Sequence, residues 1–273
     1  MGKPPPTDRI GGMALANGLL VHGPRHWAAA VQGEDGAVTV VHGRKWVMPV
    51  GPLGRVPLVR GLARMGEAFA VLPAVRRRLP QARFAMEDRR AVGVAAGAAV
   101  AAFVMRRRTR SVLAQETIGA VMGLVPALVV LRGSRAAAWH AVEHKSIAAY
   151  EAGGPSGLSR AAAQAKEHTR CGSNLVLPLM VATVAGNTVG RSFPVRHIPG
   201  ARALVGALSI GAAVEVFAFA GRRPRHPVSR VVHGTGHAMQ AGFVTREPTA
   251  AELAVGRSAM EALVAVESGD PAP

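Results

Sequence analysis

The chain has 273 residues, of which 49% are hydrophobic and only 4% aromatic, and its formal net charge is +17. The arginines form short clusters beside apolar runs, without the interleaved aromatic side chains that are typical of RNA-binding surfaces. Composition therefore favours contact between these arginines and the anionic headgroups of a membrane lipid bilayer, and we expect no nucleic-acid partner. The single cysteine excludes an intrachain disulfide.

Residues 1–54 are predicted to form an N-terminal loop and β region. The first residues, MGKPPPTDRIGG, lack the apolar core of a secretory signal. The segments WAAAVQ and AVTVVH predict two strands of a small hairpin, joined by the turn-like residues Gly33 to Gly36.

Residues 55–90 are predicted to contain an amphipathic helix. Apolar side chains recur at helical spacing opposite charged ones, at Leu58, Leu62, Met65, Phe69 and Leu72. Such a helix either packs against a core or lies in the membrane interface beside the run Arg76 to Arg78.

Residues 91–221 contain four apolar segments, at 91–105, 117–131, 175–189 and 201–220. The last is long enough to span a bilayer, whereas a helix of about 15 residues covers only about 22 Å of a roughly 30 Å hydrocarbon core. The expected fold is a mainly α, polytopic membrane bundle of about four apolar helices, some short or re-entrant, with the small N-terminal β-hairpin region. The alternative is a set of buried helices in a soluble bundle.

Lysine and arginine counts predict the orientation of such a bundle. With both termini in the cytoplasm, the basic residues at 76–90, 132–170 and 222–230 lie inside, as the positive-inside rule requires. The cluster Arg106, Arg107, Arg108 and Arg110 would lie outside and argues against this orientation. Residues 222–273 are then a cytoplasmic tail, in which Thr249 and Glu252 predict a capping box that begins a terminal helix.

The polar segment 136–172, between two pairs of apolar segments, carries the candidate chemistry. His140 and His144 are four residues apart, so one helix face presents both imidazoles to one ion. The spacing H-x-x-E-H adds Glu143, and this spacing also occurs in inverted zinc peptidases, where the glutamate activates a metal-bound water. Gly153-Gly154-Pro155 is a credible end for the helix, and Glu151 lies on the same face.

His168 and Cys171 follow as candidate third and fourth ligands, and zinc accepts imidazole nitrogen and thiolate together. Three interpretations remain open at this point. If all four residues bind the metal, the site is a closed structural clamp. If only three bind, a position is left for water, with Glu143 or Glu151 as general base. If no metal binds, these residues form a polar network.

Two other polar features lie outside this segment. Glu215, inside the longest apolar segment, is expected either to reach the site or to pair with Arg202 or Lys145. His233 and His237 are expected in a loop, because glycines flank them at Gly234 and Gly236. The chain shows no phosphate-binding P-loop, no dinucleotide G-x-G-x-x-G after a strand and no G-x-S-x-G turn.

Five stretches resemble a known family: IGGMALANGLLVHGPRHWAAAVQGEDG, VPLVRGLARMGEAF, HAVEHKSIAAYEAG, EHTRCGSN and QAGFVTREPTAAEL. They are similar, in the same order, to the YqhQ-like integral membrane proteins of bacteria, a family of unknown function described as predicted metal-dependent enzymes. The family pattern HGAEHK…AYE…HPRCGTS is matched at His140, Glu143, His144, Lys145, Tyr150, Glu151, His168, Arg170, Cys171 and Gly172, and Glu215 falls where the family has a glutamate. Departures include Thr169 in place of proline and Asn174 in place of serine, which alters the surroundings of Cys171.

These observations predict a multi-pass protein of the bacterial cell membrane with a divalent-metal site, zinc being the expected ion. The predicted ligands are His140, His144, His168 and Cys171. The predicted catalytic groups are Glu143 and Glu151 as acid or base, with Lys145 and Arg170 steadying negative charge. Metal-assisted hydrolysis is the expected reaction, and a membrane scaffold or transport component with a structural clamp is the alternative.

Overall fold

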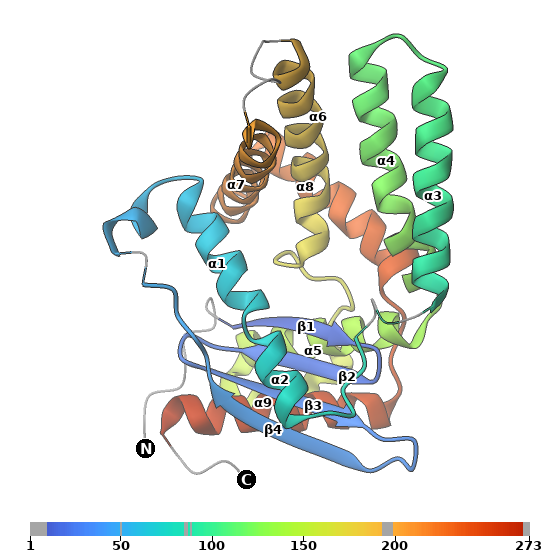
Figure 1. Ribbon diagram of the computed structural model, residues 1–273. Helices are drawn as coiled ribbons and strands as arrows, with labels where there is room; N and C mark the ends of the chain where they lie inside the picture. Colours follow the sequence, from blue (N-terminus) through green and yellow to red (C-terminus); the bar gives the residue numbers. More distant parts are fainter. Residues whose placement is uncertain (1–9, 50, 85–86, 88, 193–198, 270–273) are drawn as a thin grey trace.

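The computed structural model describes residues 10–49, 51–84, 87, 89–192 and 199–269. The described chain is mainly α-helical, with a four-stranded antiparallel sheet near its N-terminus. A layer of long apolar helices rises from a second layer in which helices cover the sheet (Figure 1). Residues 1–9 and 270–273, at the ends of the predicted N-terminal region and C-terminal tail, lie outside the described residues.

All four predicted apolar segments are helical. They form α3 (Arg89–Arg107), α4 (Val112–Leu131), α6 (Val176–Ser192) and α7 (Ala201–Arg222). Within the described residues, three stretches are long and apolar enough to cross a membrane: Val112–Leu131, Gly172–Arg191 and Ala201–Arg222. α3 is not among them, because arginine pairs at both of its ends leave a shorter apolar stretch between them.

The three candidate spans bury little of their apolar surface inside the protein. Only 6% of the apolar window in α4, 11% of that in the second stretch and 22% of that in α7 is buried. Large side chains such as Val129, Val181 and Leu204 are exposed. Apolar surface of this extent is stable in lipid or against a partner rather than in water.

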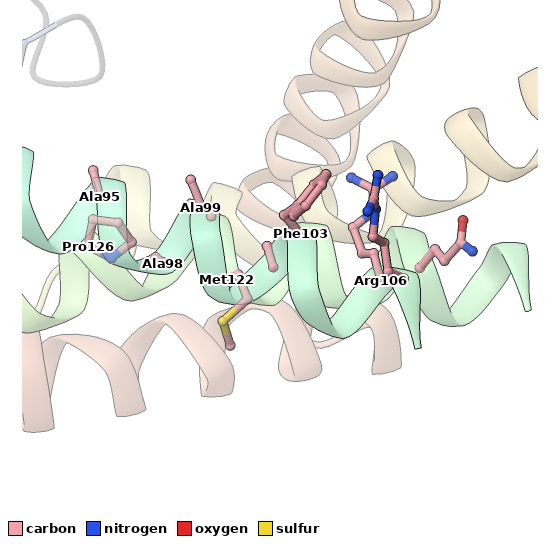
Figure 2. A pocket seen from close by; sticks show the side chains of 12 residues that line it. Ala95, Ala98, Ala99, Phe103, Arg106, Met122 and Pro126 are labelled. Atoms are coloured by element: carbon pink, nitrogen blue, oxygen red, sulfur yellow. The ribbon is translucent and has the colours of Figure 1, made fainter. Parts of the chain in front are cut away.

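α3 packs along α4 as a helical hairpin. The facing surfaces carry small side chains, among them Ala95, Ala98, Ala99 and Gly119, and they leave an apolar groove between the two helices (Figure 2).

The sheet has the order β1-β2-β3-β4, with β1 (Gly11–Leu15), β2 (Gly18–His22), β3 (His26–Gln32) and β4 (Val38–Arg44). The predicted hairpin is confirmed as β3 and β4. The two preceding strands add to it, so the region is a four-stranded meander rather than a single hairpin.

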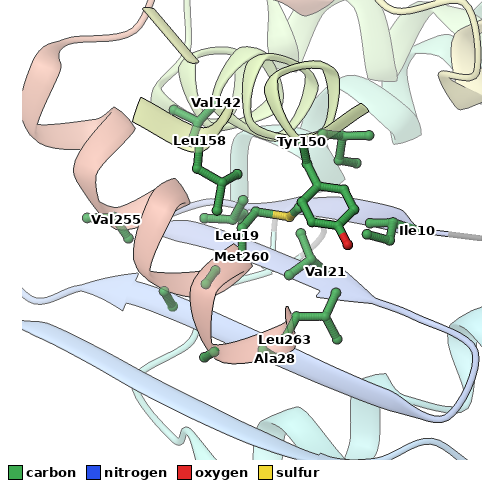
Figure 3. Packing of buried hydrophobic residues seen from close by; sticks show 14 of the residues in the cluster. Ile10, Leu19, Val21, Ala28, Val142, Tyr150, Leu158, Val255, Met260 and Leu263 are labelled. Carbon is green, nitrogen blue, oxygen red and sulfur yellow. The ribbon is translucent and has the colours of Figure 1, made fainter. Parts of the chain in front are cut away.

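Both faces of the sheet are covered. On one face, Leu19 and Val21 pack with residues of α5 (Arg135–Gly157) and α9 (Ala250–Ser268), including Tyr150 and Met260 (Figure 3). On the other face, Leu20, Trp27 and neighbouring side chains pack against α2 (Leu72–Arg78). Because successive strand residues point to opposite faces, both sets along β2 and β3 must be apolar, which explains the absence of polar alternation there.

The predicted amphipathic helix is divided into separate elements. A 3-10 turn, η2 (Gly51–Arg55), precedes α1 (Val59–Phe69), which lies along α7, and α2 then lies on the sheet. Pro73 stands in the first turn of α2, where its missing amide hydrogen costs nothing and where it favours a new helix start. The apolar side chains of this region therefore pack against two partners, α7 and the sheet, rather than one.

The C-terminal residues form α8 (Pro227–Met239), a π-helical turn η7 (Gln240–Val244) and α9. The predicted capping box of Thr249 and Glu252 is confirmed in both of its hydrogen bonds. α9 is buried against α5 and the sheet, so this helix is part of the folded core.

Replacing Gly256 with valine should disrupt the contact of α9 with α5. A Cβ at this position would lie 2.3 Å from Val142 Cγ1 and 2.7 Å from Ser146 Oγ. Overpacking of a buried contact should lower the free energy of unfolding by about 3 kcal/mol, measured by thermal or chemical denaturation of the detergent-purified protein. The matched control is Gly234→Val in α8, because a Cβ at Gly234 meets nothing within 4 Å. Equal stability of the two variants would contradict this packing.

Candidate metal centre

α5 presents the two histidines predicted as ligands on one face. The helix begins after Ser134, whose hydroxyl accepts a hydrogen bond from the Ala137 amide at 3.2 Å. One turn apart along it, the rings of His140 and His144 have centroids 4.4 Å apart. The regular helix also ends where the sequence predicts, because Gly153 and Gly154, near the end of α5, have non-helical backbone angles.

The segment after α5 returns Cys171 to this face. The chain passes through the 3-10 helix η4 (Leu158–Ala163) and reaches Cys171 immediately before η5 (Gly172–Leu175). Asn174 holds the turn in shape, because its side-chain amide donates to the carbonyls of His168, Thr169 and Cys171 at 3.3, 3.0 and 3.2 Å. The Cys171 sulfur accepts a hydrogen bond from the Ser173 amide at 3.4 Å, and such a bond stabilises a thiolate.

His140, His144 and Cys171 can hold a metal ion. Each offers one ligand atom, and these atoms all lie within 4.8 Å of one another. His140 Nε2 and Cys171 Sγ are 3.2 Å apart. His144 and Cys171 are buried.

Backbone carbonyls fix the tautomers of both histidines. His140 Nδ1 lies 2.9 Å from the Val244 carbonyl and His144 Nδ1 lies 2.6 Å from the Lys166 carbonyl. Since a carbonyl only accepts, each Nδ1 carries the proton and each Nε2 has a free lone pair. His144 Nε2 is buried without a hydrogen-bond partner among the described residues. Metal-ligating histidines are usually held by such a bond from the second ring nitrogen.

His168, the other predicted ligand, lies beside this group with both ring nitrogens engaged. Its ring centroid is 5.8 Å from that of His144. His168 Nδ1 accepts from the Arg170 amide at 3.2 Å, and Nε2 lies 3.1 Å from Glu151 Oε2. Glu151 also pairs with the Arg170 guanidinium. This trio therefore forms a network at the edge of the histidine–cysteine group.

A cavity of about 460 Å³ opens over the candidate ligands, between β1, α5 and the segment around Cys171. Its wall includes the three candidate ligands, Glu143, His168 and Arg170. Burial raises the pKa of the Glu143 carboxyl above its usual range, although the nearby His140 and His168 oppose the shift. A carboxylate with a raised pKa is a stronger base, which suits proton transfer in this cavity.

Two glycines of β1 make room for the cavity's polar groups. A Cβ at Gly12 would lie 2.6 Å from Glu143 Cγ, and a Cβ at Gly11 would lie 2.9 Å from the His22 ring. His22 lines the cavity, and burial, with the nearby Lys45 ammonium as a second cause, lowers its pKa to about 4. The pair of glycines at the start of β1 is the sequence signal for this close approach.

Lys145 faces away from the cavity. Its ammonium donates to the carbonyls of Ala162 and Gln164 at 3.1 and 2.7 Å, and it forms an ion pair with Glu247 at 2.6 Å. The side chain is 3% exposed. In this position Lys145 joins α5 to η4 and to the segment before α9.

Glu215 does not reach the site. Its carboxylate pairs with Arg60 of α1 through two hydrogen bonds and accepts the Leu58 amide at 3.2 Å. The expected pairing with Arg202 or Lys145 is therefore wrong. In the predicted amphipathic helix Arg60 lies opposite the apolar side chains, whereas α1 lies against α7 and its Arg60 guanidinium contacts Glu215.

His233 and His237 lie in α8, so the expected loop is also wrong. One of the two glycines, Gly236, serves packing, because a Cβ at this position would lie 2.1 Å from Asn174 Oδ1. His233 Nε2 lies 3.3 Å from the Ala220 carbonyl, and these histidines do not join the histidine–cysteine group.

A comparison with protein-family models matches residues 120–266 to a family described as a protein of unknown function, DUF1385. No curated protein and no solved structure matches the chain. The matched region runs from α4 into α9 and includes the three candidate ligands, Glu143, Glu151 and Arg170. Since the match covers more than half of the chain, the protein belongs to the DUF1385 family.

Proposed function

We propose that this protein is a multi-pass membrane metalloenzyme that binds zinc through His140, His144 and Cys171 and catalyses hydrolysis with Glu143 as general base. The observation that carries the proposal is the convergence of two oriented Nε2 lone pairs and a sulfur on one point, at the wall of a cavity. The buried His144 Nε2, which has no hydrogen-bond partner in the described part of the chain, is costly unless a cation or a proton donor meets it.

Zinc suits this donor set. It is borderline soft and takes imidazole nitrogen and thiolate sulfur at about 2.0 and 2.3 Å in tetrahedral geometry, so bonded nitrogen and sulfur atoms lie about 3.6 Å apart. The separation of His140 Nε2 and Cys171 Sγ, 3.2 Å, is already close to that value. Catalytic zinc sites have three protein ligands, drawn from histidine, cysteine and carboxylate side chains, and the fourth position is open.

An open rather than a closed site is favoured by the bonding of His168. Both of its ring nitrogens already have partners, Glu151 and the Arg170 amide, so ligation by His168 through either nitrogen would replace one of these contacts. His168 as a fourth ligand stays the alternative, and it corresponds to the structural clamp.

A bound zinc ion would polarise a scissile carbonyl or phosphoryl group and acidify water. Glu143 would take one proton from the attacking water and return it to the leaving group as the scissile bond breaks, so that the elements of water are added across that bond. Arg170, on the same cavity wall, would hold the negative charge of the reacting group. Glu151 would keep His168 and Arg170 in position through its two contacts.

We further propose that α4, α6 and α7 cross the bacterial cell membrane, that α3, which packs along α4, makes a fourth and shorter crossing, and that both termini and the metal centre lie on the cytoplasmic side. Support comes from their length and hydropathy and from the basic residues of 132–170 and 222–230. Residues 1–54 and 222–273 would then be cytoplasmic, residues 55–90 would lie at the interface and residues 91–221 would contain the membrane helices.

A non-enzymatic scaffold with a structural clamp is the second candidate. It is favoured by the way the group joins three separate segments, because His140 contacts the Val244 carbonyl and His144 the Lys166 carbonyl. A metal in this place would cross-link α5 to both segments, whatever its chemistry.

Elemental analysis of the detergent-purified protein tests the metal site. We expect about one zinc ion per chain, and removal of the ion by a chelator should lower the melting temperature, because an ion that binds only the folded state stabilises it. Protein that is folded, free of metal as purified and unchanged in stability on addition of zinc would overturn the proposal.

A further inference from the structure

A second cavity lies at the far end of the apolar helices. Its volume is about 600 Å³, and residues from four helices line it, including Arg106 of α3, Glu116 of α4, Arg191 of α6 and Arg202 of α7. These helix ends lie farthest from the sheet and from the metal centre (Figure 1). Nothing in the proposed hydrolysis uses them.

The charges in this cavity do not balance. Glu116 is 7% exposed and accepts hydrogen bonds from Arg106 at 2.9 Å, Arg191 at 2.8 Å and Asn187 at 3.0 Å. It is the single carboxylate of the lining, against three guanidinium groups. Arg202 has no carboxylate partner among the described residues. Two positive charges therefore face the cavity uncompensated, and the site favours an anion.

The start of α7 adds to this preference. Ala201 and Arg202 line the cavity, and the preceding Gly200 provides no side-chain cap for the helix. The first amide groups of a 22-residue helix carry partial positive charge. An anion in the cavity would meet this charge as well as the guanidinium groups.

An apolar groove continues from the cationic cavity. The groove between α3 and α4 has a volume of about 690 Å³ and shares Arg106 with it. Its walls are alanine, glycine, Phe103, Met122 and Pro126, and Arg107 stacks over Phe103 at 4.5 Å near one end (Figure 2). From Ala95 to Arg106 the groove extends about 16 Å along the helix, close to half of a roughly 30 Å hydrocarbon core.

We propose that this cavity and groove together bind one anionic membrane phospholipid. The headgroup phosphate lies between Arg106, Arg191 and Arg202, and an acyl chain lies along the groove. The cationic end is at the helix ends and the apolar part runs along the helices, which is the direction in which a bilayer lipid lies. The negative charge of such a lipid would also compensate the positive charge of the cluster Arg106 to Arg110. The positive-inside rule disfavours such a cluster on the outer side of the membrane.

The test measures lipid binding to the detergent-purified protein by native mass spectrometry, with phosphatidylglycerol, phosphatidylcholine and inorganic phosphate as probes. We expect tighter binding of the anionic lipid than of phosphatidylcholine. Arg202→Ala should weaken phosphatidylglycerol binding about fivefold, because one cation near a lipid headgroup is worth about that factor. Arg108→Ala, in the same basic cluster but outside both linings, is the matched control and should bind as the wild type does.

Filling the groove tests the acyl chain. A Cβ at Gly123 meets nothing within 4 Å, so Gly123→Leu should fill the groove without a clash and reduce phosphatidylglycerol binding. Gly97→Leu adds the same atoms to α3 outside the groove lining and should change nothing. An unchanged melting temperature shows that each variant is folded.

Three outcomes would overturn the proposal. The first is equal binding of the two lipids, and the second is equal phosphatidylglycerol binding by Arg202→Ala and its control. The third is displacement of the lipid by millimolar phosphate, together with unchanged lipid binding by Gly123→Leu. The last would assign the cavity to a free anion. None of them bears on the zinc analysis, so the two proposals fail separately.

Discussion

Replacing His144 with alanine should remove the metal ion while leaving most of the fold in place. The side chain supplies one of three ligand atoms, and its Nε2 has no other partner among the described residues. Loss of a contact to a ligating histidine alone costs 10- to 100-fold in affinity, so loss of the ligand itself should weaken zinc binding by more than about 100-fold. Equilibrium competition with a chromophoric chelator measures this change.

The control for this variant is His237→Ala. His237 is an exposed histidine of α8 outside the histidine–cysteine group, so its removal should leave zinc affinity unchanged. Cys171→Ser should behave as His144→Ala does, since a serine hydroxyl is a poor ligand for zinc. Retention of stoichiometric zinc by both His144→Ala and Cys171→Ser would assign the ion to other residues.

Replacing Glu143 with glutamine should separate metal binding from catalysis. The amide has nearly the shape of the carboxylate and should fit against Gly12 as Glu143 does, but it cannot accept a proton from water. We expect full zinc content, an unchanged melting temperature and a loss of hydrolysis of about 10²- to 10⁴-fold, the usual contribution of a general base. A panel of chromogenic ester, peptide and phosphodiester substrates, compared with the wild type, measures this loss.

Glu151→Gln is the matched control. It makes the same change in a carboxylate that contacts His168 and Arg170 and does not line the cavity, so it should reduce turnover less than Glu143→Gln. Zinc-loaded wild-type protein that hydrolyses no member of the panel, with a fold that depends on the ion, would favour the structural clamp. Equal turnover of Glu143→Gln and wild type would remove Glu143 from the mechanism.

The local patterns that the sequence predicted correctly have short-range causes. The four apolar segments form helices, WAAAVQ and AVTVVH form a hairpin, and Thr249 begins a helix. Each depends on residues a few positions apart, through hydrophobic periodicity, a turn or a cap. The pairing of His140 with His144 belongs to the same class, because helix geometry alone sets it.

The incorrect expectations involve contacts between elements distant in sequence. Glu215 pairs with Arg60, 155 residues away. Gly236 lies against Asn174, and neither it nor Gly234 breaks the helix. In each case a tertiary contact outweighs a local preference of a fraction of a kcal/mol per residue.

By itself, the sequence determined that the chain is mainly helical, that it contains segments apolar enough for a bilayer, and that two imidazoles share one helix face. Only the tertiary structure decided which groups meet those imidazoles. Cys171 lies within reach of His140, whereas His168 is held by Glu151 and Lys145 is turned to Glu247. The physical reason is that the course of the chain after α5 is set by many weak contacts of η4, Asn174 and α8, none of which leaves a periodic signal in the sequence.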